Sequence, residues 1–382
     1  MDKKLRGDAL LNVLARDPII EDNARLETLF MDFVAEATLG QSRYPGNLQL
    51  LTSGITDRAV RLGLLCSARD MDDVDWIVLT HPGSIIWPVA VSIGVEKNLT
   101  LKKLFDAAAY GYRTGATIAN FFGKSHRAKW HATSTSGAFA ATTTASIALG
   151  LTVEQHINAL HICAANIGGS PQAGFERRGA PQTNRGAAIS LGIASAHGAL
   201  LGAPNVEDIW DGPRGLIEMF FVEAENTELL NGVDAAQLRL IDTNGFTHSA
   251  VVAAEKILKK NSGTINSITV VLPVSVQAVL DGSRGGPWWN PAHAVAALFE
   301  SEDPTKLTTS TKFLSLTSLE YADIPIGSGR VRVSTDSGFY EEFVEMAPEE
   351  IIWRQKKWNE AKITDSNEAY KRCSSFPLAA LR

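Results

Sequence analysis

One stretch of small residues limits what this chain can fold into more than any other feature. From His131 to Gly150, sixteen of twenty residues are Ala, Ser, Thr or Gly. Helices built from such residues approach their neighbours closely, because the distance between packed helices depends on the side chains at the contact. The stretch therefore predicts a helix in the centre of a large all-α bundle. Ala- and Gly-rich segments over 162–169 and 186–203 support the same interpretation.

Apolar residues recur at helical spacing through most of the first 230 residues. The spacing predicts helices over Glu21–Leu39, Leu48–Ser67, Pro82–Val95, Leu101–Phe122, Ser134–Leu149, Val153–Ile167 and Arg185–Leu201. Beyond about Gln237 the pattern changes to short runs rich in β-branched residues. This second part predicts strands over Ser267–Val274, Gly329–Thr335 and Phe339–Val344, and helices over His248–Lys259, Pro291–Phe299 and Pro348–Lys362.

These patterns predict a mainly α protein with two domains. A large all-α helical bundle domain is expected from residues 1–236 and 349–382, with a smaller α+β lid domain, 237–348, inserted into it. No G-x-G-x-x-G or P-loop follows a predicted strand, so no nucleotide cofactor is expected.

Composition narrows the class of partner. The net charge is −6 and no Lys/Arg block stands out, which argues against a nucleic-acid-binding protein. Cys66, Cys163 and Cys373 are far apart in the sequence and fit neither a disulfide framework nor a metal knuckle. No apolar run reaches the roughly 18 residues that span a bilayer, and the N-terminus lacks the apolar core of a signal peptide. We expect a soluble, cytoplasmic protein that binds neither nucleic acid nor a membrane.

The first candidate site is the acidic segment Asp70–Ser84, where four carboxylates precede His81. A carboxylate that accepts a hydrogen bond from one imidazole nitrogen leaves the other nitrogen free to act as base or acid. The alternative is a solvated acidic loop that caps a helix.

A second candidate is His131, which follows a basic segment and opens the helix of small residues. Hydroxyls such as that of Thr133, together with helix amides, could hold a substrate carboxylate there. The alternative is a basic surface loop.

A third candidate is the polar, Gly-rich segment 174–185, which carries Arg177, Arg178 and Arg185. Arginine forks bind carboxylates through two hydrogen bonds. The alternative is a solvated connecting loop. In the second domain, Arg239, His248 and His293 are further candidates, although each alone is also typical of a surface or capping residue.

Competing chemistries find little support. His126 and His131 are five residues apart and no H-E-x-x-H is present, so no metal site is predicted. No G-x-S-x-G elbow marks a serine nucleophile. Metal-free acid–base chemistry is the better hypothesis.

Taken together, these segments resemble the MmgE/PrpD family, which includes 2-methylcitrate dehydratases, cis-aconitate decarboxylases and iminodisuccinate epimerases. The similar pieces, in family order, are the DxDD and THPGS motifs within 70–84, WHATSTSGAFAATTTASIALGL at 130–151, the GAAxxxG helix at 186–192, THSAVVAA at 247–254 and the TDSG turn at 335–338. The resemblance implies a helical bundle with an α+β lid, a homodimer and no organic cofactor.

The resemblance also implies roles for particular residues. Asp70 corresponds to the family's active-site aspartate, His81 to the histidine of its HPxS segment and His131 to the histidine that opens the next helix. Arg239 falls where members carry a basic lid residue, and His293 falls near a lid tyrosine used for substrate binding or proton transfer.

Three departures from the family pattern concern the substrate. The lysine expected five residues before Gly186 is Pro181 here, the YPxCxxTH lid motif is degraded at 240–248, and the chain is short near the N-terminus. These changes argue against the tricarboxylate substrates of the named members.

The resulting hypothesis is a cofactor-independent lyase, of dehydratase or decarboxylase type, that acts on a small carboxylate-bearing substrate. His131 or His81 is expected to be the base, Asp70 to orient His81 and His293 to be the acid. Arg177, Arg178, Arg185, Arg239, Thr133 and His248 are expected to bind substrate. An epimerase or double-bond isomerase that uses the same residues is the first alternative, and a non-catalytic family member is the second.

Overall fold

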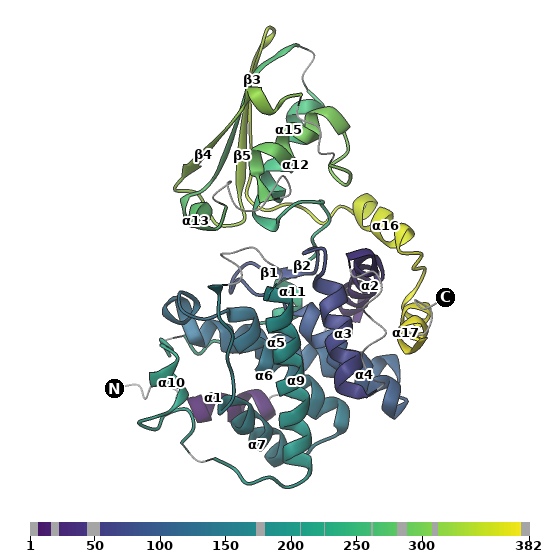
Figure 1. Cartoon of the computed structure of the whole chain (residues 1–382), viewed down its shortest axis with the longest axis vertical. Helices are drawn as coiled ribbons and strands as arrows, with labels where there is room; N and C mark the ends of the chain where they lie inside the picture. The colour runs from purple at the N-terminus through teal and green to yellow at the C-terminus, as the bar shows by residue number, and fades with distance from the viewer. Residues whose placement is uncertain are drawn as a thin grey trace. The chain divides into compact units, whose positions relative to one another are not determined.

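The computed structural model describes residues 7–16, 23–43, 54–172, 180–206, 208–224, 226–260, 263–280, 289–307 and 312–375. Most of these residues are helical, which confirms a mainly α fold. The chain divides into two compact units, and the second of them contains Arg239–Lys357 (Figure 1). The first contains the chain up to Leu238 and the segment from Trp358 onward. That the second unit serves as an inserted lid stays a prediction.

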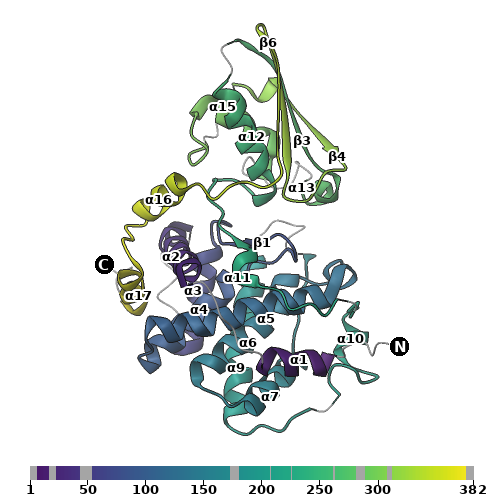
Figure 2. The ribbon, with the colours of Figure 1, turned by 180° about the vertical axis from the view of Figure 1, so that it is seen from behind.

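The first unit is a bundle of helices. Its main members are α1 (Gly7–Arg16), α2 (Asn23–Leu39), α3 (Ile55–Ser67), α4 (Gly83–Lys97), α5 (Leu101–Arg127), α6 (Ala132–Leu149), α7 (Val153–Ala164) and α9 (Ala180–Leu200). The small-residue helix α6 packs against α4, α5, α7 and α9, as Figure 2 shows. Every side chain from Ala132 to Ser146 is buried. The small residues therefore do what the sequence predicts, since they let four helices surround a fifth.

The close approach of the helices to α6 leaves no room for a side chain at two glycines. A Cβ added at Gly111 of α5 would collide with Thr144 of α6, and one at Gly192 of α9 would collide with Ala141. Interiors packed this densely tolerate no extra methyl group without a shift of the backbone.

Helix α5 runs past its predicted end at Phe122. Gly123 interrupts it with φ 76° and ψ −171°, a conformation that favours glycine. The helix then resumes, and the Glu223 carboxylate accepts a hydrogen bond from the Ser125 amide at 2.7 Å. A carboxylate in this position satisfies an amide that has no partner within the new turn.

The acidic segment between α3 and α4 is held by backbone pairing. Strand β1 (Val74–Asp75) pairs antiparallel with β2 (Ala236–Gln237). The Asp75 and Thr80 backbones also exchange two hydrogen bonds, at 2.8 and 3.2 Å. The segment is thus a structured connection and not the solvated loop of the alternative interpretation.

The second unit contains a four-stranded sheet of order β4-β3-β5-β6. Strand β3 (Ile265–Pro273) pairs parallel with β4 (Thr317–Ala322) and antiparallel with β5 (Gly329–Thr335), which in turn pairs antiparallel with β6 (Gly338–Val344). Helices α12 (His248–Leu258) and α15 (Pro291–Ser301) pack against the sheet. Three of these strands match the sequence prediction, and β4 is an addition to it.

Short elements and the C-terminal helices complete the chain. They are α10 (Leu216–Met219), α11 (Gly232–Ala235), α13 (Gln277–Leu280), α16 (Ile351–Glu360) and α17 (Ser366–Ser375). Helix α17 packs against α2 and α4 within the first unit. Ser366 Oγ donates to Glu27 Oε1 at 2.6 Å, and the Tyr370 hydroxyl donates to the Leu99 carbonyl at 3.2 Å.

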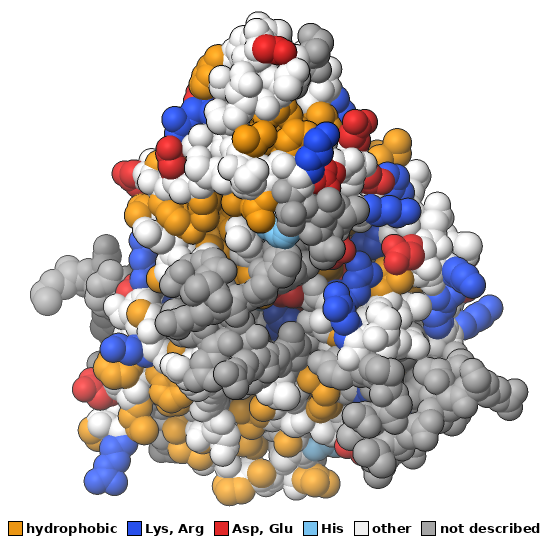
Figure 3. Space-filling view, turned by 45° about the horizontal axis from the view of Figure 1, so that its top comes forward, with side chains coloured by type: hydrophobic (Ala, Val, Ile, Leu, Met, Phe, Trp, Pro, Cys, Tyr) orange, Lys and Arg blue, Asp and Glu red, His pale blue; other side chains and the backbone are white. Residues whose placement is uncertain are grey.

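Charged side chains are dispersed over the surface in view in Figure 3, where acidic and basic groups alternate with apolar ones. Within the described part of the chain, no helix is both long and apolar enough to cross a membrane.

Helix α1 is joined to α7 by a histidine whose two nitrogens both face oxygen atoms. His161 Nε2 lies 3.1 Å from Asp8 Oδ1, and Nδ1 lies 2.5 Å from Asn205 Oδ1. Burial lowers the pKa of His161, but the hydrogen bonds that the ring donates to Asp8 and Asn205 outweigh it and raise the pKa above its ordinary value. The protonated imidazolium pairs with Asp8 and so links α1 to α7.

We expect Asp8→Asn to lower the free energy of unfolding by about 1 kcal/mol at pH 6 and by less at pH 8.5. The reason is that a raised histidine pKa stabilises the folded state at low pH, and this contribution disappears as the pH rises through that pKa. Chemical denaturation at the two pH values measures the difference. Asp106→Asn, which removes an exposed ion pair with Lys102, is the control and should have little effect at either pH. An equal loss at both pH values for Asp8→Asn would contradict the prediction.

Candidate active site

His81 lies just before α4 and makes two contacts that fix its position. Its Nδ1 is 3.0 Å from the backbone carbonyl oxygen of Asp73, and its own amide donates to Thr133 Oγ1 at 3.3 Å. A carbonyl oxygen only accepts, so Nδ1 carries the hydrogen and Nε2 of the neutral ring holds a lone pair. The His81 side chain is 22% exposed, so it is accessible to a ligand.

The Asp73 carboxylate joins the acidic segment to two helices. One oxygen accepts from the Gly83 amide at 2.7 Å, at the start of α4, and the other accepts from the Tyr112 hydroxyl of α5 at 2.6 Å. The Tyr112 oxygen accepts in turn from Trp87 Nε1 at 2.9 Å. A negative charge beside the first amides of a helix is favourable, because these amides lack partners within the helix.

Asp72 forms a buried ion pair with Arg185. The distance between Asp72 Oδ2 and Arg185 Nη1 is 3.0 Å, and the two side chains are 1% and 3% exposed. The same carboxylate oxygen lies 3.9 Å from His81 Nδ1. A substrate carboxylate that reaches Arg185 would therefore share the guanidinium with Asp72.

His131 is the residue before α6, and it lies close to the same groups. Its amide donates to the Gly169 carbonyl at 2.9 Å, and its Nδ1 is 3.0 Å from Ser134 Oγ. Burial, followed by the positive charge of Arg185 and that of His81 when His81 is protonated, lowers the pKa of His131 to about 3. The ring is therefore neutral at physiological pH.

Three separate elements thus contribute to one group of side chains in the first unit: the acidic segment, the start of α6 and α9. They bring together Asp72, Asp73, His81, His131, Thr133 and Arg185. The contacts given above do not test the role predicted for Asp70, which is to orient His81. Asp70 lies in the left-handed region, with φ 54°, and its role stays a prediction. Arg177 and Arg178 lie outside the described residues.

The second unit contains two of the predicted residues, at the starts of two helices that pack together. His248 opens α12 and donates from Nε2 to the Thr243 carbonyl at 3.1 Å, while His293 lies in the first turn of α15. The Asn244 side chain, ahead of α12, donates to the Trp289 carbonyl, ahead of α15, at 3.4 Å. The starts of the two helices are therefore adjacent. Burial lowers the pKa of His293.

Arg239 is also in the second unit and is 3% exposed. Its backbone carbonyl accepts a hydrogen bond from Lys357 Nζ at 3.2 Å. The part that Arg239, His248 and His293 play in substrate binding or proton transfer stays a prediction.

His126, also in the first unit, serves packing. His126 Nδ1 donates to the Phe220 carbonyl at 2.7 Å, and Nε2 lies 2.8 Å from Thr135 Oγ1, so both nitrogens are engaged. Burial lowers the pKa of His126 to about 4. No group of three or more His, Cys, Asp or Glu side chains within the described ranges is arranged to hold a metal ion.

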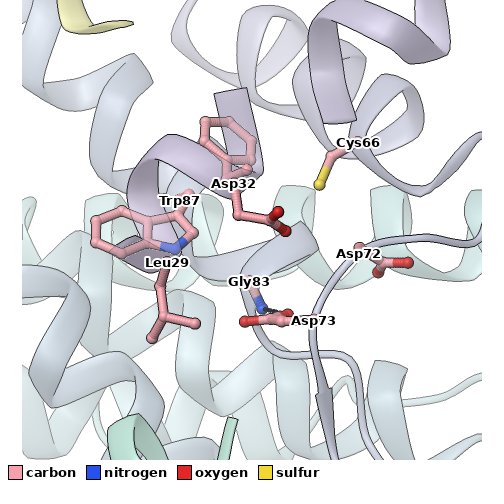
Figure 4. Close-up of a pocket in the computed structure, with 8 residues that line it drawn as sticks. Leu29, Asp32, Cys66, Asp72, Asp73, Gly83 and Trp87 are labelled. Carbon is pink, nitrogen blue, oxygen red and sulfur yellow. Dashed lines mark hydrogen bonds between the residues drawn. The ribbon is translucent and has the colours of Figure 1, made fainter. Parts of the chain in front are cut away.

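A small pocket adjoins the acidic segment. It has no room for a water-sized molecule and is lined by Leu29, Asp32, Phe33, Cys66, Asp72, Asp73, Gly83 and Trp87. Figure 4 shows Asp32, Cys66 and Asp73 directed toward this space. Ligand pockets are usually about 300–1,000 Å³, so this one is too small to be a substrate site by itself.

Cys66 of this pocket is not a nucleophile. Burial, together with the negative charges of Asp72, Glu36, Asp73 and Asp32, raises the pKa of the thiol well above its ordinary value. The thiol is therefore protonated and unreactive at physiological pH.

Nothing in the sequence indicates that Tyr112 is a partner of the acidic segment. Tyr112 lies within a helix, 39 residues from Asp73, and a tyrosine in a largely apolar stretch is typical of an ordinary core residue. Sequence reasoning also could not select Asp72 and Asp73 from the four carboxylates of the segment.

A comparison with known families identifies the family of this chain. The MmgE/PrpD N-terminal domain matches residues 32–229, more than half of the chain, so the protein belongs to the MmgE/PrpD family. The matched range includes every first-unit side chain of the site. No curated protein matches the chain. The family includes dehydratases and related enzymes, which supports a lyase-type enzyme in general terms.

We expect Gly83→Ala to destabilise the protein by about 2 kcal/mol or more, because it displaces a buried, charge-assisted hydrogen bond. A Cβ at Gly83 would lie 2.6 Å from Asp73 Oδ2, so the carboxylate would have to leave the helix amide. Gly198→Ala in α9 is the matched control, since its Cβ would make only ordinary contacts at 3.6 Å and beyond. Urea denaturation of both variants measures the effect. A Gly83→Ala protein as stable as the control would show that the Asp73 contact is dispensable.

Proposed function

We propose that this protein is a cofactor-independent lyase that acts on a small carboxylate-bearing substrate. In its dehydratase form, a proton next to a carboxylate or carbonyl group is removed and the β hydroxyl, once protonated, departs as water. In its decarboxylase form, a carboxylate group departs as carbon dioxide and the carbanion that remains takes up a proton. The observation that carries the proposal is the grouping of two imidazoles at one site, His81 with a lone pair on Nε2 and His131 uncharged.

His81 is the better placed base. Its Nε2 lone pair takes the proton, and the ring then becomes an imidazolium. The Asp73 carbonyl at 3.0 Å and the Asp72 carboxylate at 3.9 Å both stabilise that positive charge. A base whose protonated form is stabilised in this way supports proton abstraction without a metal ion.

His131 takes a different part. A ring with a pKa of about 3 is a weak base, but a neutral imidazole donates a hydrogen bond to developing negative charge. The Ser134 hydroxyl also lies 3.0 Å from the His131 carbonyl oxygen, to which it donates. In the proposed role it turns from that carbonyl and donates to Nδ1, which places the ring hydrogen on Nε2. His131 would then stabilise the enolate-like intermediate, as a preorganised donor in a site with little water.

The remaining roles complete the proposal. His293 protonates the leaving group or the carbanion carbon, and Asp70 contributes to the orientation of His81. Arg177, Arg178, Arg185 and Arg239 hold the substrate carboxylate, together with Thr133 and His248. Because Pro181 replaces the family lysine and Arg185 is paired with Asp72, we propose a substrate with fewer carboxylates than a tricarboxylate. From family membership we also propose a cytoplasmic homodimer.

A second candidate function uses the same residues for epimerisation or double-bond isomerisation. It is favoured by the origin of the two imidazoles on different elements, the segment before α4 and the start of α6. Groups on separate elements are able to face opposite sides of one carbon atom. A third possibility, a non-catalytic protein that binds a carboxylate, would leave the substrate unchanged.

Proton NMR of the protein in D₂O with a panel of mono-, di- and tricarboxylates distinguishes these functions. We expect new alkene signals or the loss of a substrate carbon, which identify a lyase. Deuterium at an α position of an intact skeleton would identify the isomerase or epimerase. An unchanged panel, with no ligand-dependent rise in melting temperature, would favour the non-catalytic alternative.

We expect His81→Gln to lower kcat by about 10²–10⁴-fold, the usual contribution of a positioned base. His131→Ala should cause a loss of at least about 10²-fold, since it removes a donor to the developing charge. His197→Gln, on α9, is the control because His197 only donates to the carbonyl of Ile193 in its own helix. Turnover close to normal in His81→Gln would refute the assigned base.

A further inference from the structure

We propose that Tyr112 is a positioning residue that acts through Asp73 to hold His81 with its hydrogen on Nδ1 and its lone pair on Nε2. The inference rests on the proposed function insofar as His81 is the base. No feature of the sequence singled out Tyr112, and the proposal gives its hydroxyl group a function.

The direction of the Tyr112 hydroxyl follows from its two partners. Trp87 Nε1 is only a donor, so the contact of 2.9 Å uses the Tyr112 oxygen as acceptor. The single hydroxyl hydrogen is then free to point at Asp73, at 2.6 Å. Trp87 and Tyr112 are fully buried, so water does not compete for either contact.

The Tyr112 hydroxyl is also a permanent donor. Burial and the neighbouring charge of Asp73 raise the pKa of Tyr112 well above its ordinary value, so the phenol keeps its hydrogen across the physiological range. At physiological pH the Tyr112 hydroxyl therefore remains the donor in its hydrogen bond to Asp73.

Asp73 transmits this constraint to His81 through its own backbone. Its side chain is fixed at both oxygens, by Tyr112 and by the Gly83 amide. With the side chain fixed, the orientation of the carbonyl group of the same residue is restricted as well. That carbonyl accepts from His81 Nδ1 at 3.0 Å and so selects one tautomer of the ring.

Stability of the fold alone does not require the hydrogen bonds among Trp87, Tyr112 and Asp73. A buried polar group that keeps its partners adds little net stability, and an apolar pair of similar size is often as stable. Hydrogen bonds do supply something that apolar contacts lack, which is a defined direction. At this position the direction determines which nitrogen of His81 meets the substrate.

The test is the tautomer of His81 in the full chain, read by ¹⁵N NMR of protein labelled at its histidine rings. His81→Gln identifies the His81 signals. In the wild-type protein we expect a protonated Nδ1 and an unprotonated Nε2. In Tyr112→Phe we expect this preference to be lost, with the hydrogen found on Nε2 in a substantial fraction of the molecules.

Tyr370→Phe is the matched control. It deletes a hydroxyl that donates to the Leu99 carbonyl, just beyond the other end of α4 from His81. It should leave the His81 tautomer as in the wild-type protein. If Tyr112→Phe does not fold, Asp73→Asn serves in its place, because an amide of the same size cannot accept both hydrogen bonds, and the same loss of preference is expected.

A wild-type tautomer in a folded Tyr112→Phe or Asp73→Asn protein would overturn the inference, as would Nε2–H in the wild-type protein. Once a substrate that the enzyme converts is known, Tyr112→Phe should lower kcat by about tenfold and shift the pH dependence of kcat, with KM little changed. These readouts separate the two claims. Normal turnover in His81→Gln refutes the proposed base, whereas the tautomer is measured without any substrate.

Discussion

The charge of Asp73 is the feature on which the first unit of this protein depends. A buried carboxylate costs several kcal/mol unless its oxygens are paired. Here the pairing comes from the start of α4 and from the middle of α5. The same contacts require a glycine at position 83 and a tyrosine at position 112. The requirement to satisfy one charge therefore fixes where the acidic segment runs, and with it the position of His81.

The neighbouring charges determine the chemistry that the site supports. Arg185 forms an ion pair with Asp72 at 3.0 Å. Burial of the His131 ring, followed by the positive charge of Arg185, keeps that imidazole uncharged. A neutral ring donates a hydrogen bond to an oxyanion without the cost of desolvating a cation. The site is thus suited to proton transfer between neutral or singly charged groups. This agrees with the family's lyase-type activity and with the proposed small carboxylate substrate.

The sequence predicted the bundle well because its signal is local. A run of small residues marks α6, and the order of short motifs indicates the family. It indicates segment 70–84 as a candidate site, but which of Asp70, Asp72 and Asp73 contact His81 depends on backbone directions that no periodicity reports. Strand β4 was missed since its side chains are at most half-buried, and α17 because its apolar stripe is narrow and its other residues are polar. Tyr112 was missed because its partner lies 39 residues away.

The most direct test of this account is the titration of His131 by NMR in the full chain, with the signal identified by its absence in His131→Ala. The account predicts that the ring stays neutral from pH 8 to pH 5, because burial and the charges of Arg185 and His81 lower its pKa to about 3. A midpoint near the ordinary value of about 6.5 for His131 would contradict the account. It would mean that His131 is neither desolvated nor close to the positive charges that define the site.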